Sequence, residues 1–277
     1  GGIRMVATDG AGSGAAVTDV LDVLGGTGNV GLGSGAFGTG LTTGTDNVAI
    51  GEAAGDALTS GSENTFVGDN AGGATTTASY NTAVGRNALL VNSTGASNTA
   101  VGKGALDANT TGSDNVGLGA LALSANTTAS NNVAVGRSAL EANTTGTSNV
   151  AVGYQALDAQ TTASNNTAVG SSALTANTTG HSNVAVGIAL AANTTGDQNV
   201  AVGFAALGSN TTATGNTAVG DYALQGNTTG ANNVSVGKNA LLGNTTASSN
   251  TAVGYDALKA NTTGTGNVAV GTSSLDA

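Results

Sequence analysis

The fold is decided by a 17-residue stretch that recurs along most of the chain. One copy reads Asn149-Val150-Ala151-Val152-Gly153-Tyr154-Gln155-Ala156-Leu157-Asp158-Ala159-Gln160-Thr161-Thr162-Ala163-Ser164-Asn165. A short, fixed period of this kind is the sequence signature of a solenoid, in which each coil packs only against its neighbours. The opening Asn recurs every 17 residues, and one spacing of 18 offsets one of 16. It stands at Asn29, Asn47, Asn64, Asn81, Asn98, Asn115, Asn132, Asn149, Asn166, Asn183, Asn199, Asn216, Asn233, Asn250 and Asn267.

The columns of the aligned copies predict the path of each coil. With the opening Asn as position zero, position one is Val or Thr, position two mostly Ala or Gly, position three aliphatic and position four Gly. Alternation with period two is typical of a β-strand. We expect positions one and three to face inward and position two outward. The Gly suits a corner with positive φ, the Ala-Leu pair near position eight suggests a second short strand, and Asn-Thr-Thr is turn chemistry.

One coil cannot be stable alone. Two Val and one Leu contribute ~5–7 kcal/mol on full burial, whereas ordering 17 residues costs on the order of 25 kcal/mol. Stacking resolves this deficit, because each coil then bonds to the coils above and below it and extends a shared core. The sequence therefore predicts an all-β protein. It is a parallel β-solenoid, a thin β-roll of about fifteen coils over residues 29–277, with residues 1–28 as an N-terminal cap or joint segment.

Composition argues against several function classes. The net charge is −10 with only six Lys and Arg, so a basic surface for nucleic acid is not expected. No apolar run approaches the roughly 20 residues that span a bilayer, so this segment is not expected to insert into a membrane. The chain has no Cys and a single His, His181, so we expect no catalytic triad, no metal site, no cofactor and no enzymatic activity.

The segment Asn149-Val150-Ala151-Val152-Gly153 resembles the Asn-Ser-Val-Ala-Ile-Gly repeat of trimeric autotransporter adhesin heads of the YadA type, and it is similar to repeats of phage tail fibres and other surface fibres. The resemblance covers residues 29–277. It implies a left-handed parallel β-roll, three chains side by side, and attachment at a surface. This chain departs from the family repeat in its longer coil, its frequent Thr at position one and its added Asn-Thr-Thr turns.

If position two faces outward, the small residues there form a stripe along one sheet. An apolar stripe of this length is an expected contact surface, where close backbone approach lets copies of the chain associate. The predicted association stripe comprises Ala83, Ala100, Ala134, Ala151, Ala168, Ala185, Ala218 and Ala252.

The recurring Asn-Thr-Thr triplet has two interpretations. It matches the N-glycosylation acceptor pattern, but sites in neighbouring coils would lie only roughly 4.8 Å apart. We favour an Asn ladder whose amides bond along the stack, and sugar on some Asn or Thr side chains stays open. The candidate acceptors are Asn109, Asn143, Asn177, Asn227 and Asn261.

Position five is the most varied column, as an outward corner would be. Exposed Tyr and Arg side chains are favoured in contacts with partners, so this corner is the candidate ligand contact. Ice binding by ranks of Thr is less favoured, because the Thr of position one shares its column with Val and is expected to face inward. The candidate contact residues are Tyr154, Phe204, Tyr255, Arg86 and Arg137.

These observations favour an extracellular or cell-surface rod, or a virion fibre. We expect a segment of an adhesin or fibre that acts by multivalent contact and mechanical span, with copies of itself as partners and a host, matrix or neighbouring-cell surface as a target. A filament subunit that polymerises head to tail is the first alternative, since an open coil end is a template for pairing. A solenoid that binds glycan or ice is the second.

Overall fold

The computed structural model describes residues 28–276 and confirms an all-β parallel solenoid. The predicted segment 1–28 lies almost wholly outside the described residues. The chain divides into two compact units, Gly1–Asn131 and Asn132–Ala277. The first contains β1 Val30–Leu32, β2 Val48–Ile50, β3 Thr65–Val67, β4 Thr82–Val84, β5 Thr99–Val101 and β6 Val116–Leu118. The second contains β7 Val133–Val135, β8 Val150–Val152, β9 Thr167–Val169, β10 Val184–Val186, β11 Val200–Val202, β12 Thr217–Val219, β13 Val234–Val236, β14 Thr251–Val253 and β15 Val268–Val270.

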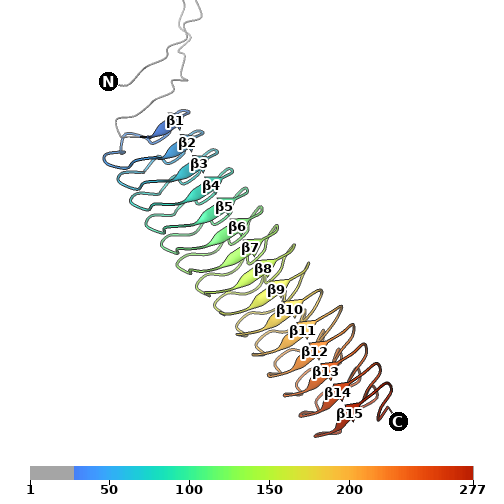
Figure 1. Ribbon diagram of the computed structural model, residues 1–277. Coiled ribbons are helices and arrows are strands. Elements are labelled where there is room, and N and C mark those ends of the chain that lie inside the picture. The colour runs from blue at the N-terminus through green and yellow to red at the C-terminus, as the bar shows by residue number, and fades with distance from the viewer. Residues whose placement is uncertain (1–27, 277) are drawn as a thin grey trace, which may run out of the picture. The chain divides into compact units, whose positions relative to one another are not determined.

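Within each unit, every strand pairs in parallel with the next one in the sequence (Figure 1). Identical positions face each other: Val150 pairs with Thr167, and Ala151 with Ala168. A coil is named here after its strand, so coil 8 contains β8. The parallel register places each column of the sequence in one line along the stack, which is why the column analysis can be read as a map of the surface and the core.

The rest of each coil returns through turns, and the predicted second strand is wrong. Its residues at positions six and eight have positive φ, for example Ser138 at 55° and Leu140 at 54°, which is incompatible with a β-strand. The backbone there is still bonded from coil to coil, because the Leu140 N–H donates to the Ala156 carbonyl at 2.9 Å. The return path is thus a second hydrogen-bonded ladder without strand geometry.

The predicted facing of the strand is also wrong. Position two is the buried position, and the Ala side chains of the predicted association stripe are fully inaccessible. Positions one and three face outward, with side chains such as Val169 and Val186 exposed by 38% and 37%. The corrected residues, all at 0% exposure, are Ala83, Ala100, Ala134, Ala151, Ala168, Ala185, Ala218 and Ala252.

The narrow interior explains why Ala, and not Val, faces inward. In coil 13 the position-two residue is Ser235, and its hydroxyl donates across the coil to the Ala240 carbonyl at 2.7 Å. A side chain only two heavy atoms long therefore already reaches the returning backbone. The core consists of this Ala column, a facing Ala column at position seven and the Leu column at position eight, of which Leu157 and Leu174 are fully buried.

The predicted Gly corner at position four is confirmed. Gly136 has a φ of 132°, and a Cβ added to it would lie 2.5 Å from the carbonyl oxygen of Gly153 in the next coil. The position excludes larger residues for two reasons, the left-handed backbone and the close approach of the neighbouring coil. This explains why all fifteen coils have Gly there.

Candidate interaction surfaces

Two ladders of Asn side chains run along the inside of the stack. In the first, formed by the opening Asn residues, the backbone N–H and Nδ2 of Asn216 both donate to Oδ1 of Asn199, at 3.0 and 3.3 Å. In the second, formed by the Asn of the turns, Nδ2 of Asn227 donates to Oδ1 of Asn210 at 3.1 Å and to the Gly230 carbonyl at 2.9 Å. The predicted ladder is confirmed, and a second one accompanies it.

The turn ladder contradicts N-glycosylation of the folded chain at four of the five candidate sites. Asn109, Asn143, Asn177 and Asn227 are fully buried, and each amide donates to a backbone carbonyl of its own turn. A glycan on that nitrogen would have to break the ladder and open the coil. Asn261 is partly exposed, although its amide also bonds, to Oδ1 of Asn244 and the Gly264 carbonyl, both at 3.0 Å.

The outer face of the sheet is the most uniform surface in each unit. It consists of two ranks, position one with Val or Thr and position three with Val, Ile or Leu, and neither rank contains a charged residue. The side chains stand about one third exposed, as in Ile50 at 38%, Leu118 at 36% and Val219 at 37%. The apolar stripe therefore exists, but it is formed by the aliphatic residues at position three together with the β-branched Val and Thr residues at position one.

The predicted outward corner at position five is confirmed as a surface. Tyr154 and Phe204 are each 48% exposed and Tyr255 is 50% exposed. Arg137 is exposed, and Arg86 forms an ion pair of 3.3 Å with Asp69, one coil earlier in the same column. The tyrosines, Phe204 and Arg137 belong to the second unit and Arg86 to the first. Contact of this corner with a ligand stays a prediction.

His181 takes part in the bonding between neighbouring coils. His181 is exposed, its Nδ1 accepts the Ser164 N–H at 3.0 Å, and its own N–H donates to Asp197 at 2.7 Å. Ser occupies the same place in other coils, as where the Thr147 N–H donates to the Ser164 hydroxyl. The single His thus takes the place of the Ser hydroxyl as an acceptor between coils.

The carboxyl group of Asp256 lies in a small hydrogen-bonded network at coil 14. It is only 8% exposed and accepts hydrogen bonds from Asn239 Nδ2 at 2.8 Å and Lys259 Nζ at 3.1 Å. The Asn239 bond and then the Lys259 charge lower the pKa of Asp256, against the opposing effect of partial burial, and Asp256 in turn raises the pKa of Lys259. This network lies beside Tyr255 at the position-five corner.

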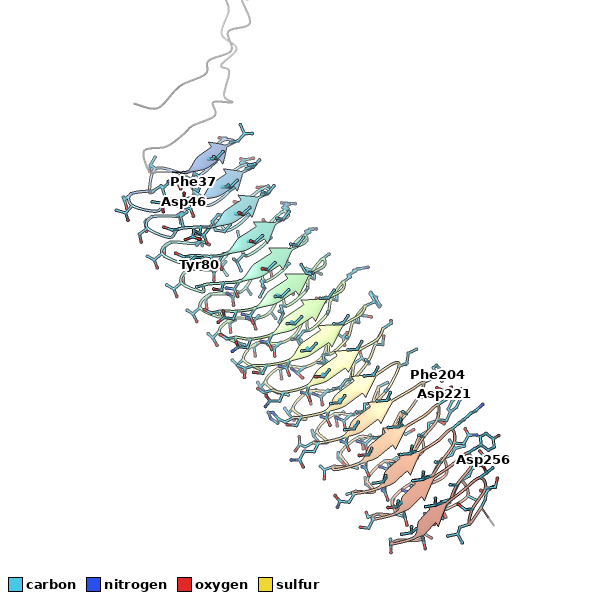
Figure 2. All side chains as sticks on the ribbon, in the orientation of Figure 1. Phe37, Asp46, Tyr80, Phe204, Asp221 and Asp256 are labelled. Carbon is cyan, nitrogen blue, oxygen red and sulfur yellow. The ribbon has the colours of Figure 1, made fainter. Side chains whose placement is uncertain are left out.

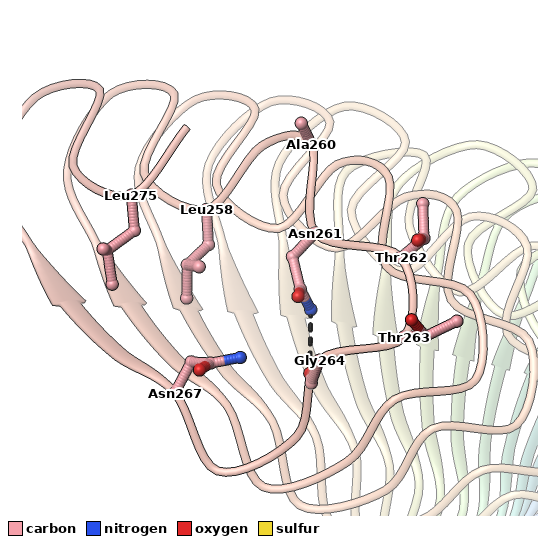
Figure 3. A pocket seen from close by; sticks show the side chains of 8 residues that line it. All are labelled: Leu258, Ala260, Asn261, Thr262, Thr263, Gly264, Asn267 and Leu275. Atoms are coloured by element: carbon pink, nitrogen blue, oxygen red, sulfur yellow. Dashed lines mark hydrogen bonds between the residues drawn. The ribbon is translucent and has the colours of Figure 1, made fainter. Parts of the chain in front are cut away.

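A hollow of about 360 Å³ lies against the turn of coil 14, with Asn267 and Leu275 of coil 15 beside it (Figure 3). It marks the end of the Leu and Asn columns of the core, so we assign no ligand to it. Among residues 28–276, no group of three or more His, Asp or Glu side chains is placed to hold a metal ion, and no helix has the length and hydropathy of a bilayer crossing. The lining residues are Leu258, Ala260, Asn261, Thr262, Thr263, Gly264, Asn267 and Leu275.

Comparisons of the chain with protein families, with curated proteins and with solved structures find no match. The resemblance to trimeric autotransporter adhesin heads, together with its implied trimer and left-handed coil, therefore stays a prediction from the repeat.

Proposed function

We propose that the chain is a structural segment of a cell-surface adhesin or fibre, and that its coils associate side by side with copies of itself through the outer sheet face. The observation that carries this proposal is the pair of uncharged, branched ranks at positions one and three. The surface location and the preference for three copies rest on the resemblance of the repeat. Neither an enzymatic activity nor a cofactor is part of the proposal.

The coil-to-coil bonding supports a mechanical role. Both the strand and the return path bond to the neighbouring coils, as in the bonds from Val133 to Asn149 and from Leu140 to Ala156, at 2.8 and 2.9 Å. The Asn ladders add side-chain bonds in the same direction. Force along the stack is thus shared by many parallel hydrogen bonds in every coil, which suits a spacer that must carry load.

The size of the outer face supports self-association. With about 4.8 Å per strand and about 3.3 Å per residue, the face covers roughly 290 Å² on β1–β6 and roughly 430 Å² on β7–β15. A stable interface buries about 800 Å² on each partner. The face on β7–β15 thus supplies by itself about half of that area, and its branched side chains lose little rotamer freedom on contact.

The test places charge on this face. In the double variant Val169→Lys with Val186→Lys, two neighbouring position-three side chains of coils 9 and 10 become cationic. The matched control, Thr179→Lys with Thr195→Lys, adds the same charge to exposed turn positions of the same coils. We expect light scattering to show a multimer for the wild type and the control, with a trimeric mass implied by the resemblance, and a monomer for the valine variant.

Circular dichroism on all three proteins establishes that the coils remain folded. A wild-type chain that stays monomeric at high concentration would overturn the proposal, and so would a control that dissociates as fully as the valine variant. Negative-stain electron microscopy adds a second readout, since discrete particles support a fibre segment. Long filaments would instead favour head-to-tail polymerisation.

A further inference from the structure

The position-five corner of the second unit has exposed aromatic side chains that the proposed structural role does not require. Tyr154, Phe204 and Tyr255 stand there with about half of each side chain exposed. Exposed aromatic rings are costly to leave in water and dominate the energy of binding surfaces. Only 3% of the chain is aromatic, so the gathering of three rings in one column is a distinct property of this corner.

The three rings are evenly spaced. Tyr154 follows β8, Phe204 follows β11 and Tyr255 follows β14, each at position five of its coil. Because strands of a sheet repeat at about 4.8 Å, three coils separate neighbouring rings by ~14 Å and the outer pair by ~29 Å. A ligand that contacts all three must be long, extended and aligned with the stack.

The middle ring is held in place before any ligand arrives. The rings of Phe204 and Tyr222 meet edge to face, with centroids 5.3 Å apart and planes at 79°. The Phe204 N–H donates to Asp221 Oδ1 at 3.1 Å, and the two residues lie together at one edge of the stack (Figure 2). Ile188, one coil earlier in the column, is 45% exposed and widens the apolar surface around this ring. A ring fixed in this way loses little entropy on binding.

The side chains between the rings include polar groups and charges of both signs. Between Tyr154 and Phe204 the column contains Ser171 and Ile188, and between Phe204 and Tyr255 it contains Asp221 and Lys238. Alternating signs disfavour a uniformly charged polymer such as nucleic acid. The single-file arrangement also offers too little continuous apolar area for a protein interface. Flat rings separated by hydrogen-bonding groups suit a chain of sugar rings, whose axial C–H groups pack on aromatic faces and whose hydroxyls bond to polar side chains.

We propose that the ridge formed by Tyr154, Ile188, Phe204, Lys238 and Tyr255 binds a linear, uncharged polysaccharide that lies along the stack. The rings supply the stacking contacts, and the mixed polar side chains between them bond to sugar hydroxyls. Binding at three points gains affinity from effective concentration, since the second and third contacts are intramolecular once the first has formed. This site is separate from the sheet face that carries the proposed self-association.

The test measures retardation of the full chain in native gels that contain hydroxyethyl cellulose, soluble xylan, galactomannan or glycol chitin. We expect at least one of these to retard the wild type. In the triple variant Tyr154→Ala, Phe204→Ala and Tyr255→Ala, the affinity for the retarding polymer should fall by more than about tenfold. The loss of each aromatic contact alone costs about this factor. Tyr80→Ala is the matched control, because Tyr80 is 59% exposed but stands at position sixteen of a coil in the first unit.

Chain length gives a second readout. Oligosaccharides of the retained sugar should bind more tightly once they are long enough to reach two neighbouring rings, and again at three. In Phe204→Ala the first of these gains should vanish, and only a chain that spans Tyr154 and Tyr255 should still gain affinity. No retardation by any of the four polymers would overturn the proposal. Equal retardation of the triple variant, or equal weakening by Tyr80→Ala, would do so as well. Light scattering of the triple variant shows whether it still self-associates, so that a loss of polysaccharide binding can be told apart from a loss of self-association.

Discussion

The ring of Phe66 fills the space that a side chain at Gly72 would occupy. A Cβ added to Gly72 would lie 2.5 Å from the Phe66 ring, and one added to Gly55 would lie 2.9 Å from it. Phe66 is the one aromatic residue in the Ala column at position two, and the two Gly residues interrupt the Leu column at position eight. The core therefore conserves volume across the coil, with a large residue on the strand matched by small ones opposite.

This relationship predicts a compensating pair of substitutions. Gly72→Leu should destabilise the chain by roughly 1–3 kcal/mol, because the new side chain overlaps the Phe66 ring. Backbone strain is a minor cause, since the Leu residues of this column already have positive φ, as in Leu89 at 55°. Combining Gly72→Leu with Phe66→Ala should restore much of the loss. Urea unfolding of both single variants and the double variant measures the coupling energy between the two positions. If the stability losses of the single variants simply add in the double variant, the predicted compensation is wrong.

A buried hydroxyl predicts a stabilising substitution. Thr75 occupies the turn-Asn column, is fully buried, and its Oγ1 has no hydrogen-bond partner within the described chain. Thr75→Val should therefore raise stability by about 1 kcal/mol, since a desolvated, unbonded group is removed at nearly constant shape. Thr76→Val is the control, because its Oγ1 donates to the Ser93 carbonyl at 3.1 Å. The control should lose stability; a loss in both variants would contradict the assignment.

The opening-Asn ladder predicts a large loss at a single buried amide. Asn216 donates to Asn199 and to the Gly230 carbonyl, and its Oδ1 accepts from both nitrogens of Asn233. Asn216→Ala should cost roughly 2–4 kcal/mol, because several buried partners lose their bonds together. Asn232→Ser, at an exposed position that is Ser in the next coil, should stay within about 0.5 kcal/mol. Similar unfolding midpoints for the two variants would show that the ladder contributes little.

The lowered pKa of Asp256 predicts a pH dependence with a defined sign. A carboxyl whose pKa is lower in the folded chain stabilises the fold above its unfolded pKa, and this contribution is lost as the pH falls through the folded value. Wild type should therefore exceed Asp256→Asn in stability at neutral pH, and the difference should shrink below about pH 4. Because the Asn239 bond is the main cause of the shift, Asn239→Ala should raise the Asp256 pKa in an NMR titration. An unchanged pKa would contradict this origin.

The repeat alone was sufficient to predict the solenoid, the position of the strands and the Gly corner. The facing of the strand could not be predicted from the alternation, because a period of two leaves open which set of residues is inside. Hydrophobicity favoured Val as the inner residue, yet most coils are so narrow that a small residue such as Ala fits at position two, and the large Phe66 fits only where the Leu column has Gly. The exceptions to the column pattern pointed to the correct facing. The large Phe66 at position two occurs where the Leu column has the small residues Gly55 and Gly72. This compensation is expected if both columns share the interior, and it has no reason if position two faces outward.

The return path was mispredicted for a different reason. Ala-Leu has the composition of a short strand, but Leu140 and its equivalents adopt positive φ, which costs roughly 1–2 kcal/mol for a residue with a side chain. Burial of the Leu and the coil-to-coil bond of its N–H offset that cost. The positive φ of these Leu residues depends on contacts with neighbouring coils, so it cannot be predicted from the local sequence.

The two irregular coils show that the return path tolerates single insertions and deletions. β1 and β2 pair position for position across 18 residues, and β10 and β11 do so across 16. The extra residue lies beyond Phe37, and the missing one lies between Ile188 and Ala189, so both irregularities fall in the return path. Single insertions and deletions there are absorbed within one coil, whereas duplication or loss of a whole coil leaves every other pairing intact. A gene of this kind can change the reach of its product in steps of ~4.8 Å by recombination between repeats, without redesigning any interface.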